Sequence, residues 1–246
     1  MESFWLKIYN KSSRKVLKSR KEIRHYEPSF ILSPTDSFSN DFLVKLFSQA
    51  IQKSWTDIII LPEHATHDSM YLNICPGEHY RLLKAITKIL NVKLAVEIGT
   101  YTGLGSIAMM QGQSNGHIVT YDIVPWNTLP TNLSQEYFDN NLVSQRIVDL
   151  SDANNFSQNI SILNDADIIF LDGPKDGVFE YKFVSLLKQL SPKRDKLLII
   201  DDIHFVNMID LWISILSPKL DVTSFGHWSG TGIVDISQPL QLKSIS

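Results

Sequence analysis

Short apolar runs alternate with amphipathic segments over most of the chain after residue 90, and this alternation predicts the fold. Seven runs are predicted strands, at residues 94–98, 117–122, 145–148, 167–171, 197–200, 222–225 and 232–236. Between the first five lie segments of helical character, centred on residues 106–110, 135–140, 154–163 and 179–190. Strands that are apolar on both sides are typical of parallel sheets covered by helices on both faces. We therefore expect an α/β fold with a Rossmann-like, doubly wound, mostly parallel seven-stranded sheet.

The N-terminal third of the chain lacks this alternation. Apolar positions recur at helical spacing over residues 41–54, and a further helix over residues 80–90 leads into the first predicted strand. We interpret residues 1–75 as an N-terminal helical arm or lid, and residues 76–246 as the Rossmann-like domain.

Composition narrows the setting in which the protein acts. The chain has 246 residues, 43% of them hydrophobic, which is enough to bury one large core. No apolar run is long enough to span a bilayer, and the start lacks the apolar segment of a secretory signal. Cys75 is the only cysteine, which excludes a disulfide within the chain and a CxxC metal site. We expect a soluble, cytoplasmic protein with no membrane partner.

Charge is distributed unevenly. The net charge is −3, but eight basic residues against two acidic ones give residues 1–24 a formal charge of +6. Such an arm can attract acidic partners, yet its basic run lacks the aromatic interleaving suited to stacking on bases. We expect a solvated helix or tail rather than a nucleic-acid site, and the N-terminal arm is a candidate surface for a homodimer.

A glycine-rich turn follows the first predicted strand. That strand contains Glu97 and runs into Gly99, Gly103 and Gly105. Glycines permit a tight turn and a close approach of the backbone to a ligand, and the helix that follows offers free N–H groups. In a doubly wound sheet this edge binds nucleotide-like ligands. The spacing differs from the GxGxxG of dinucleotide enzymes, which argues against the alternative of a nicotinamide-dependent oxidoreductase.

Acidic residues close the next two predicted strands. Asp122 ends the second strand, where a carboxylate accepts hydrogen bonds from both ribose hydroxyls of an adenosine ligand. Asp149 ends the third, where it can contact the adenine amino group with Leu150 against the ring face. The alternative for Asp149 is a charge at the start of the next helix. The pattern predicts an adenosine site.

Three carboxylates follow the fourth and fifth predicted strands. Asp172 ends the fourth strand, and Asp201 and Asp202 end the fifth. Adjacent ends of parallel strands lie on one rim of the sheet, so these acids are expected to cluster. A hard cation relieves their repulsion, and oxygen ligands suit Mg²⁺, Mn²⁺ or Ca²⁺ rather than Zn²⁺. The alternative is that they cap helices and form salt bridges.

The sequence resembles a known enzyme family at these positions. The ExGxxxGxG pattern from Glu97 to Gly105 resembles motif I of class I S-adenosylmethionine-dependent methyltransferases, and EIGTYTGLGSIAM looks like the first motif of catechol and caffeoyl-CoA O-methyltransferases. Asp172 followed by Lys175 matches their fourth-strand motif. They carry Asp-Asn after the fifth strand, whereas the Asp-Asp pair here resembles macrocin and novobiocin-type sugar O-methyltransferases. The resemblance covers roughly residues 75–236.

The resemblance implies an enzyme that methylates a hydroxyl of a small molecule, with S-adenosylmethionine as cofactor and a divalent cation, Mg²⁺ first among them. It implies that Asp172, Asp201 and Asp202 bind the metal and that Lys175 removes the acceptor's proton. Independently of the resemblance, His204 follows the acidic pair by two positions and is a candidate for an alternative base or further ligand, with a place on the following helix as the alternative. The implied cofactor-binding residues are Glu97, Gly99, Thr100, Tyr101, Gly103, Gly105, Ser106, Asp122, Asp149, Leu150 and Asp172.

Some features depart from the family pattern or leave alternatives open. Gly105 stands where the family has Ser, which shifts the expected contact with the cofactor carboxylate to Ser106. A non-catalytic cofactor-binding or RNA-associated module remains an alternative, and so do N- and C-methylation, because this fold serves many reactions. His64, His67, His79 and Trp228 are candidates for the acceptor entrance, with core or lid packing as the alternative for Trp228.

Overall fold

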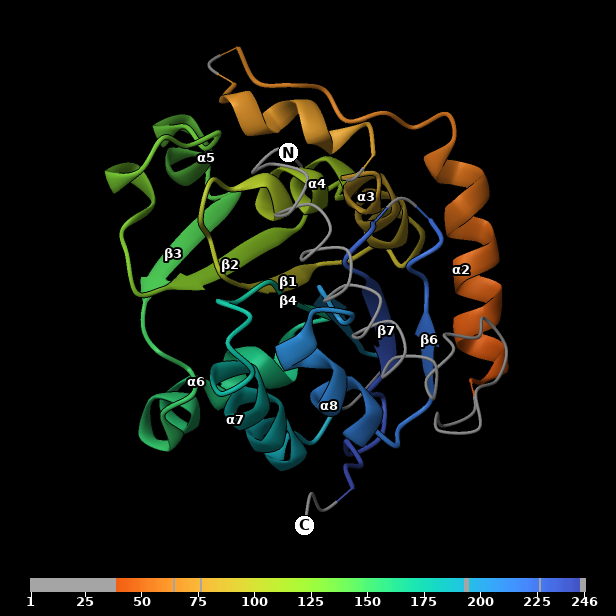
Figure 1. The fold of residues 1–246 in the computed structure, drawn as a ribbon. Coiled ribbons are helices and arrows are strands. Elements are labelled where there is room, and N and C mark those ends of the chain that lie inside the picture. The colour runs from red at the N-terminus through yellow and green to blue at the C-terminus, as the bar shows by residue number, and fades with distance from the viewer. Residues whose placement is uncertain (1–38, 64, 76, 193–194, 226, 244–246) are drawn as a thin grey trace, which may run out of the picture.

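The computed structural model describes residues 39–63, 65–75, 77–192, 195–225 and 227–243 (Figure 1). The basic segment 1–24, with its nucleic-acid interpretation, lies outside the described residues, and so does His64. The homodimer through the N-terminal arm stays a prediction. None of the helices in the described part of the chain is both long and apolar enough to cross a membrane.

A seven-stranded sheet forms the centre of the fold. Its strands are β1 (Leu94–Ile98), β2 (His117–Asp122), β3 (Val143–Ile147), β4 (Ile168–Leu171), β5 (Leu197–Asp201), β6 (Lys219–Asp221) and β7 (Thr231–Asp235). Their order across the sheet is β3-β2-β1-β4-β5-β7-β6. The first five strands run parallel, and β7 runs antiparallel to both β5 and β6. The predicted Rossmann-like, mostly parallel sheet is confirmed.

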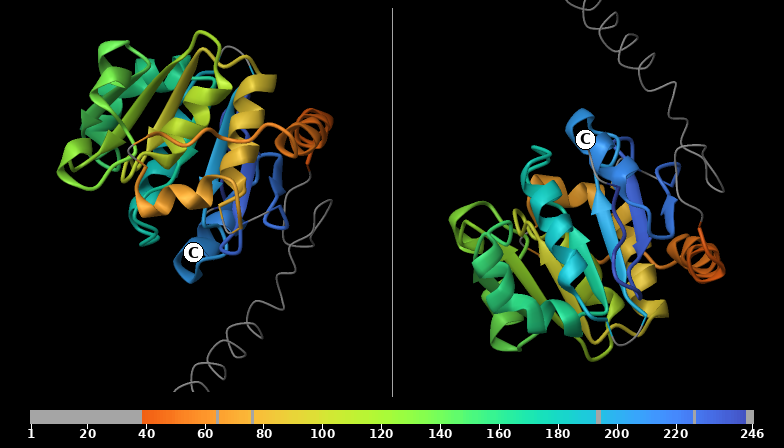
Figure 2. Two further views of the ribbon diagram at one scale, coloured as in Figure 1. Left: turned by 90° about the horizontal axis from the view of Figure 1, so that it is seen from above. Right: turned by 90° about the horizontal axis from the view of Figure 1, so that it is seen from below.

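Helices cover both faces of this sheet, as the two turned views show (Figure 2). The α-helices are α2 (Asp41–Ser54), α3 (His79–Ile89), α4 (Leu104–Gly112), α5 (Gln135–Asp139), α6 (Ala153–Asp165), α7 (Phe179–Leu186) and α8 (Val206–Ser214). Short 3-10 helices lie at η1 (His67–Leu72), η2 (Trp126–Thr128) and η3 (Leu187–Gln189).

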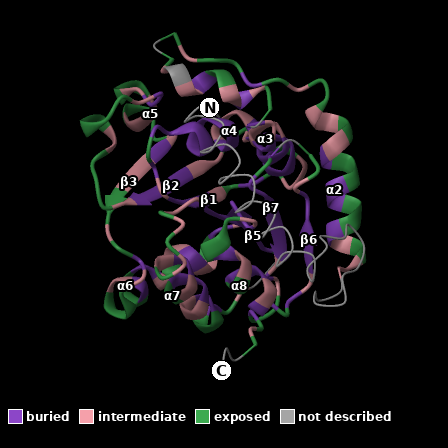
Figure 3. Ribbon diagram, in the orientation of Figure 1, coloured by how far each residue is buried: buried purple, intermediate pink, exposed green. Residues whose placement is uncertain are grey.

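The central strands β4 and β5 are apolar over most of their length because successive side chains enter two different cores. In β4, Ile168 and Phe170 join a cluster with α2, α3 and α4, whereas Ile169 and Leu171 join a second cluster with α6, α7 and α8. Successive strand residues point to opposite faces, so a strand covered on both sides has no polar face. Figure 3 shows the central strands as largely buried. The carboxyl ends of β1, β4 and β5 therefore meet at one edge between two rigid layers.

The sixth strand begins three residues earlier than predicted and ends at Asp221, directly before the predicted segment 222–225. β6 contains two charged residues, Lys219 and Asp221, and both are buried with partners. The Lys219 ammonium lies 4.5 Å from the centre of the Trp212 ring, and Asp221 Oδ2 lies 2.7 Å from His204 Nε2. Hydrophobicity alone cannot identify a strand whose charged residues are buried against partners distant in the sequence.

Helix α2 packs along the edge of the sheet beside β6 and β7 (Figure 1). Its buried residues Leu43, Leu46, Phe47 and Ala50 belong to the same hydrophobic cluster as α3, α4 and the strands. The N-terminal boundary at residue 75 stays a prediction, and the described part of that segment shares its core with the sheet.

Candidate active site

The glycine turn after β1 needs glycine at two positions. Gly99 has φ +97° and Gly103 has φ +83°, values that favour glycine over residues with a side chain. A Cβ on Gly99 would also collide with the backbone carbonyl of Asp172. The predicted turn thus brings the end of β1 into direct contact with the end of β4.

Asp122 holds this turn from the end of β2. Its Oδ2 accepts hydrogen bonds from the backbone N–H groups of Thr100 at 2.9 Å and Tyr101 at 3.2 Å. Its Oδ1 accepts from the backbone of Ile123 and Val124 at 2.7 and 3.1 Å. Asp122 therefore holds the turn through four backbone hydrogen bonds, and its role with ribose stays a prediction.

Glu97 is buried beneath the turn, and its environment explains the departure at Gly105. A Cβ on Gly105 would collide with Glu97 Oε1 and the Phe170 ring, so no side chain fits there. The hydroxyl of Ser106, which is fully buried, donates instead to Glu97 Oε2. Burial raises the pKa of Glu97 to about 8, although the hydrogen bond from Ser106 opposes that shift. Ser106 therefore fixes the position of the Glu97 carboxyl group through this hydrogen bond.

Asp149 and Leu150 lie after β3, at the far side of the turn. Asp149 Oδ1 accepts a hydrogen bond from the Ser151 backbone at 2.8 Å, and Leu150 is buried in the core with α6. Asp152, not Asp149, caps α6 by accepting from the backbone of Asn154 and Asn155. The predicted adenine contacts of Asp149 and Leu150 stay predictions.

A cavity of about 230 Å³ opens over the turn. Its lining combines the turn with residues from α3, β4 and the loop before β7, among them Glu97, Gly99, Thr100, Tyr101, Gly103, Gly105, His79, Tyr80, Asp172 and His227. Burial, together with the negative charges of Asp172 and Asp201, raises the pKa of Tyr80 well above its usual range. Tyr80 therefore contributes a neutral phenol to the cavity.

The three predicted carboxylates converge next to this cavity, which Asp172 alone of the three lines. Ligand atoms of Asp172, Asp201 and Asp202 all lie within 4.8 Å of one another. The Lys175 ammonium stands among them: it contacts Asp172 Oδ1 and lies 3.0 Å from Asp202 Oδ2 and 3.9 Å from Asp201 Oδ2. We call these three acids the carboxylate cluster.

The loop after β4 aims Lys175 at the carboxylate cluster. Lys175 has φ +57°, a strained value for a residue with a side chain. Glu180, a fully buried residue of α7, compensates by accepting hydrogen bonds from the backbone of Lys175 at 2.6 Å and Gly177 at 3.0 Å. Because Glu180 holds the backbone of this loop, the Lys175 side chain is directed toward the carboxylate cluster.

The electrostatics of the cluster call for positive charge. Burial, followed by the charge of Asp201, raises the pKa of Asp172 to about 6, although Lys175 opposes the shift. Burial alone would lower the pKa of Lys175, but the three carboxylates outweigh it and hold that pKa well above its usual range. The Lys175 ammonium thus supplies the positive charge among the three carboxylates that a bound metal ion would otherwise supply. Three converging oxygen ligands fit a hard divalent ion, so the residues present match the implied metal.

His204 and Trp228 lie apart from the carboxylate cluster. His204 Nε2 pairs with Asp221 Oδ2 at 2.7 Å and belongs to neither group of potential metal ligands found among the described residues. Trp228 follows His227 directly, and 73% of its surface is exposed, with the Phe205 ring 6.3 Å away.

His227 is a site residue that sequence reasoning missed, as it missed Tyr80. His227 Nδ1 lies 3.0 Å from Asp201 Oδ1, and this histidine lines the cavity. Burial lowers the pKa of His227, but the hydrogen bond and charge of Asp201 outweigh that effect and raise it. Because β7 pairs antiparallel with β5, the loop before β7 returns to the rim where β5 ends. A prediction that β7 pairs antiparallel with β5 would have placed His227 beside Asp201.

Comparisons with known proteins agree with this geometry. The family model described as O-methyltransferase matches residues 42–209. No curated protein sequence matches the chain.

Among solved structures, the chain is similar to a methyltransferase from Geobacter sulfurreducens, with 15% identity over 90% of this chain and 97% of that one and a TM-score of 0.50. It is also similar to the S-adenosylhomocysteine-bound methyltransferase PaMTH1 of Podospora anserina, with 14% identity over 94% and 96% of the two chains and a TM-score of 0.47. An O-methyltransferase from Bacillus cereus in complex with S-adenosylhomocysteine has 14% identity over 78% and 90%, with a TM-score of 0.38.

The matched segment contains the glycine turn, Lys175 and the whole carboxylate cluster. The family match also decides between methyl transfer and the nicotinamide and non-catalytic alternatives. Since it spans well over half of the sequence, the chain belongs to the O-methyltransferase family of S-adenosylmethionine-dependent enzymes.

Proposed function

We propose that the enzyme methylates a hydroxyl oxygen of a small molecule with the help of a divalent cation of the Mg²⁺ type at the carboxylate cluster. The observation that carries this proposal is the convergence of Asp172, Asp201 and Asp202 around the Lys175 ammonium, at the side of the cavity that the glycine turn lines. A bound divalent cation would lower the pKa of an acceptor hydroxyl and stabilise the negative charge that develops on it.

Asp172 joins the donor side of the cavity to the acceptor side. Its backbone carbonyl packs against Gly99 of the turn, while its carboxylate belongs to the cluster. A methyl donor bound by the turn and an acceptor bound at the cluster would therefore both lie next to Asp172. Holding two reactants close together in this way can supply a large part of an enzyme's rate enhancement. With the three acids alone around it, Lys175 is a protonated ammonium. A divalent cation bound at the cluster would lower the pKa of Lys175, and the neutral amine could then take the proton of the acceptor hydroxyl.

The surroundings favour an acceptor with two neighbouring oxygens. A vicinal diol, a catechol or a sugar offers such a pair, which suits a cation that prefers oxygen ligands. Trp228, beside the cavity-lining His227, presents an exposed ring that can stack on a planar or sugar acceptor.

The test is methyl transfer from S-adenosylmethionine to a panel of catechols, vicinal diols and sugars, followed as release of S-adenosylhomocysteine. We expect EDTA to abolish the activity and Mg²⁺ to restore it. Replacing Asp202 by Gly removes one carboxylate at a position with φ +59°, which Gly tolerates. This Asp202→Gly variant should lose at least about 100-fold in activity, the lower end of what acid–base and electrostatic assistance contribute.

Asp210→Gln is the matched control, because Asp210 is an exposed acid of α8 outside the cluster. It should retain wild-type activity and metal response. S-adenosylhomocysteine binding, measured by calorimetry, should persist in both variants, since neither residue lines the cavity. Activity that survives both EDTA and Asp202→Gly would reject the role of the cation and leave the family assignment intact.

A further inference from the structure

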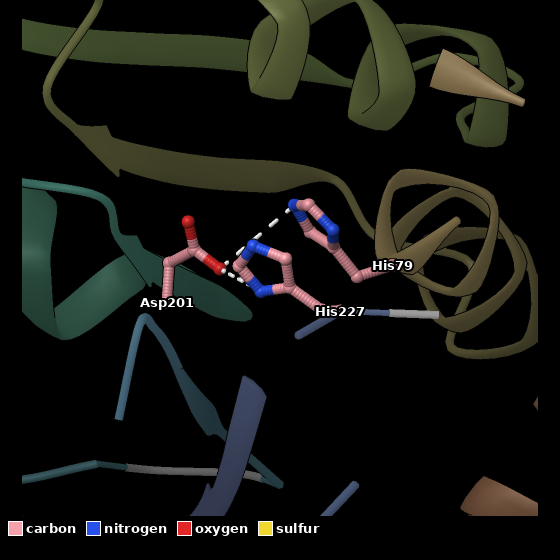
Figure 4. Close-up of side chains that lie close together, drawn as sticks. All are labelled: His79, Asp201 and His227. Atoms are coloured by element: carbon pink, nitrogen blue, oxygen red, sulfur yellow. Dashed lines mark ion pairs between the residues drawn. The ribbon is translucent and has the colours of Figure 1, made fainter. Parts of the chain in front are cut away.

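Two histidines approach Oδ1 of Asp201, and His227 Nε2 also lies 3.7 Å from Asp202 Oδ1. His79 comes from the start of α3, His227 from the loop before β7, and Asp201 from the end of β5 (Figure 4). All three are buried, with exposed fractions of 5%, 8% and 4%. Ligand atoms of the three lie within 4.8 Å of one another, which defines a second group that we call the histidine cluster.

The two oxygens of Asp201 serve different clusters. Oδ1 lies 3.0 Å from His227 Nδ1 and 3.8 Å from His79 Nε2, while Oδ2 lies 3.9 Å from Lys175 Nζ. The imidazole rings of His79 and His227 stack with their centroids 4.0 Å apart. One carboxylate thus belongs to two neighbouring groups of different chemistry.

The donor atoms of the histidine cluster differ from those of the carboxylate cluster. Two imidazole nitrogens and one carboxylate oxygen suit first-row transition-metal ions such as Zn²⁺, Co²⁺ or Fe²⁺ rather than Mg²⁺. At metal–ligand distances of about 2.0–2.1 Å, the ligand atoms of a tetrahedral ion stand about 3.3 Å apart. The two measured contacts to Asp201 Oδ1 lie on either side of that separation, so small side-chain movements would complete a three-ligand site.

The position of the cluster gives such an ion access to ligands from solution. His79 and His227 both line the cavity, together with Asp172 and the glycine turn. Three protein ligands leave at least one coordination position of a four-coordinate ion unfilled, as in zinc sites that bind water or substrate. That open position would face the same cavity as the proposed acceptor.

We infer that His79, Asp201 and His227 form a second metal site, which binds a first-row transition-metal ion beside the carboxylate cluster and shares Asp201 with it. The inference goes beyond the proposed methyl transfer and does not depend on it, because the ion's binding can be measured without turnover.

Co²⁺ is the probe, because it reports its own coordination through visible absorption. The full chain, freed of metal with EDTA and then dialysed, is titrated with Co²⁺ in excess Mg²⁺, which occupies the carboxylate cluster. We expect the absorption bands of a four-coordinate ion with nitrogen ligands, at one equivalent. His79→Gln and His227→Gln should each weaken Co²⁺ binding at least tenfold.

Two control variants separate this site from other places where Co²⁺ could bind. His117→Gln alters a histidine of β2 that bonds to Asn141 and Ser144, and Asp172→Asn alters the carboxylate cluster alone. His117→Gln should keep the Co²⁺ affinity within twofold. Asp172→Asn should keep Co²⁺ bound by two imidazoles with an affinity no weaker than that of the wild type, because weaker Mg²⁺ binding at the carboxylate cluster relieves competition for Asp201. X-ray absorption at the cobalt edge of the wild-type protein should count two imidazole ligands, which tests the site even if a histidine variant does not fold.

Oxygen-only coordination of Co²⁺, or loss of binding in Asp172→Asn with none in the histidine variants, would overturn the inference. Either result would leave Mg²⁺-dependent methyl transfer untouched, because that activity is assayed separately. Conversely, Co²⁺ bound by two imidazoles in a protein without Mg²⁺-dependent activity would support the histidine cluster and reject the proposed function.

Discussion

Glu97 combines complete burial with a pKa raised to about 8, from an ordinary value of 4.5. Between these two pH values the folded protein holds a proton that the unfolded chain has released. Stability is therefore expected to fall as the pH rises from about 4.5 to about 8, because the native state binds more protons than the unfolded state over that interval.

Replacing Glu97 by Gln removes this pH dependence and still provides an oxygen that can accept the hydrogen bond from Ser106. We expect the free energy of unfolding of Glu97→Gln to match wild type near pH 4 and to exceed it by about 4 kcal/mol at pH 8, since one pKa unit corresponds to about 1.4 kcal/mol. Urea unfolding at both pH values measures the difference. Glu136→Gln, at an exposed position of α5, should show no such trend, and equal stabilities of Glu97→Gln and wild type at pH 8 would contradict the argument.

Residue patterns in the sequence located most of the site. Glu97, the glycines and the three acids stand directly at the ends of strands, where chain order and position in the sheet coincide. His227 could not be found in this way, because its partner Asp201 is distant in the sequence and the two meet only through antiparallel pairing of β5 with β7. The same holds for the pairing of His204 with Asp221.

The loop between β4 and α7 is the element on which the proposed proton transfer depends. One buried side chain, Glu180, fixes its backbone through Lys175 and Gly177, each N–H bonded to a different carboxylate oxygen. The conformation of the loop is thus determined by a residue of α7 and not by residues that line the cavity.

Glu180→Gln is expected to loosen this loop, because an amide group has one accepting oxygen and cannot bond both N–H groups. The turnover number should fall about tenfold, as is common when a supporting interaction is lost, while the KM for S-adenosylmethionine changes little. Steady-state kinetics separate the two quantities. A rise in KM with an unchanged turnover number would assign Glu180 to cofactor binding instead.

At the level of elements, the strands from β1 to β5 followed from the apolar pattern to within about two residues. The pattern succeeded best at β4 and β5, whose residues are all buried and almost all apolar. It failed at β6, whose charged residues owe their burial to Trp212 and His204, partners that sequence alone does not identify.

Helix α2 contributes to the packing of the whole molecule together with the sheet. Phe47 of α2 is completely buried and meets the Phe225 ring edge-on at 4.9 Å, in the turn just before His227. The helix predicted to be an arm or lid therefore supports the loop that completes the cavity.

Phe47→Ala should destabilise the protein by about 3–5 kcal/mol, the usual cost of truncating a buried phenylalanine. Val44→Ala, a few residues away on the exposed side of α2, should cost less than about 0.5 kcal/mol. Denaturant unfolding of both variants measures the contrast. A loss below about 1 kcal/mol in Phe47→Ala would mean that α2 adds little to the stability of the sheet domain.

Asp201, with one oxygen toward each cluster, also has a thermodynamic consequence. An ion held on the histidine side draws electron density from a carboxylate on which the opposite side relies, so occupancy of the two sides is linked. Linkage is reciprocal: whatever factor Mg²⁺ imposes on the affinity for a transition metal, that metal must impose on the affinity for Mg²⁺. The ratio of the two ions in the surrounding medium, and not either concentration alone, would then set which form of the enzyme prevails.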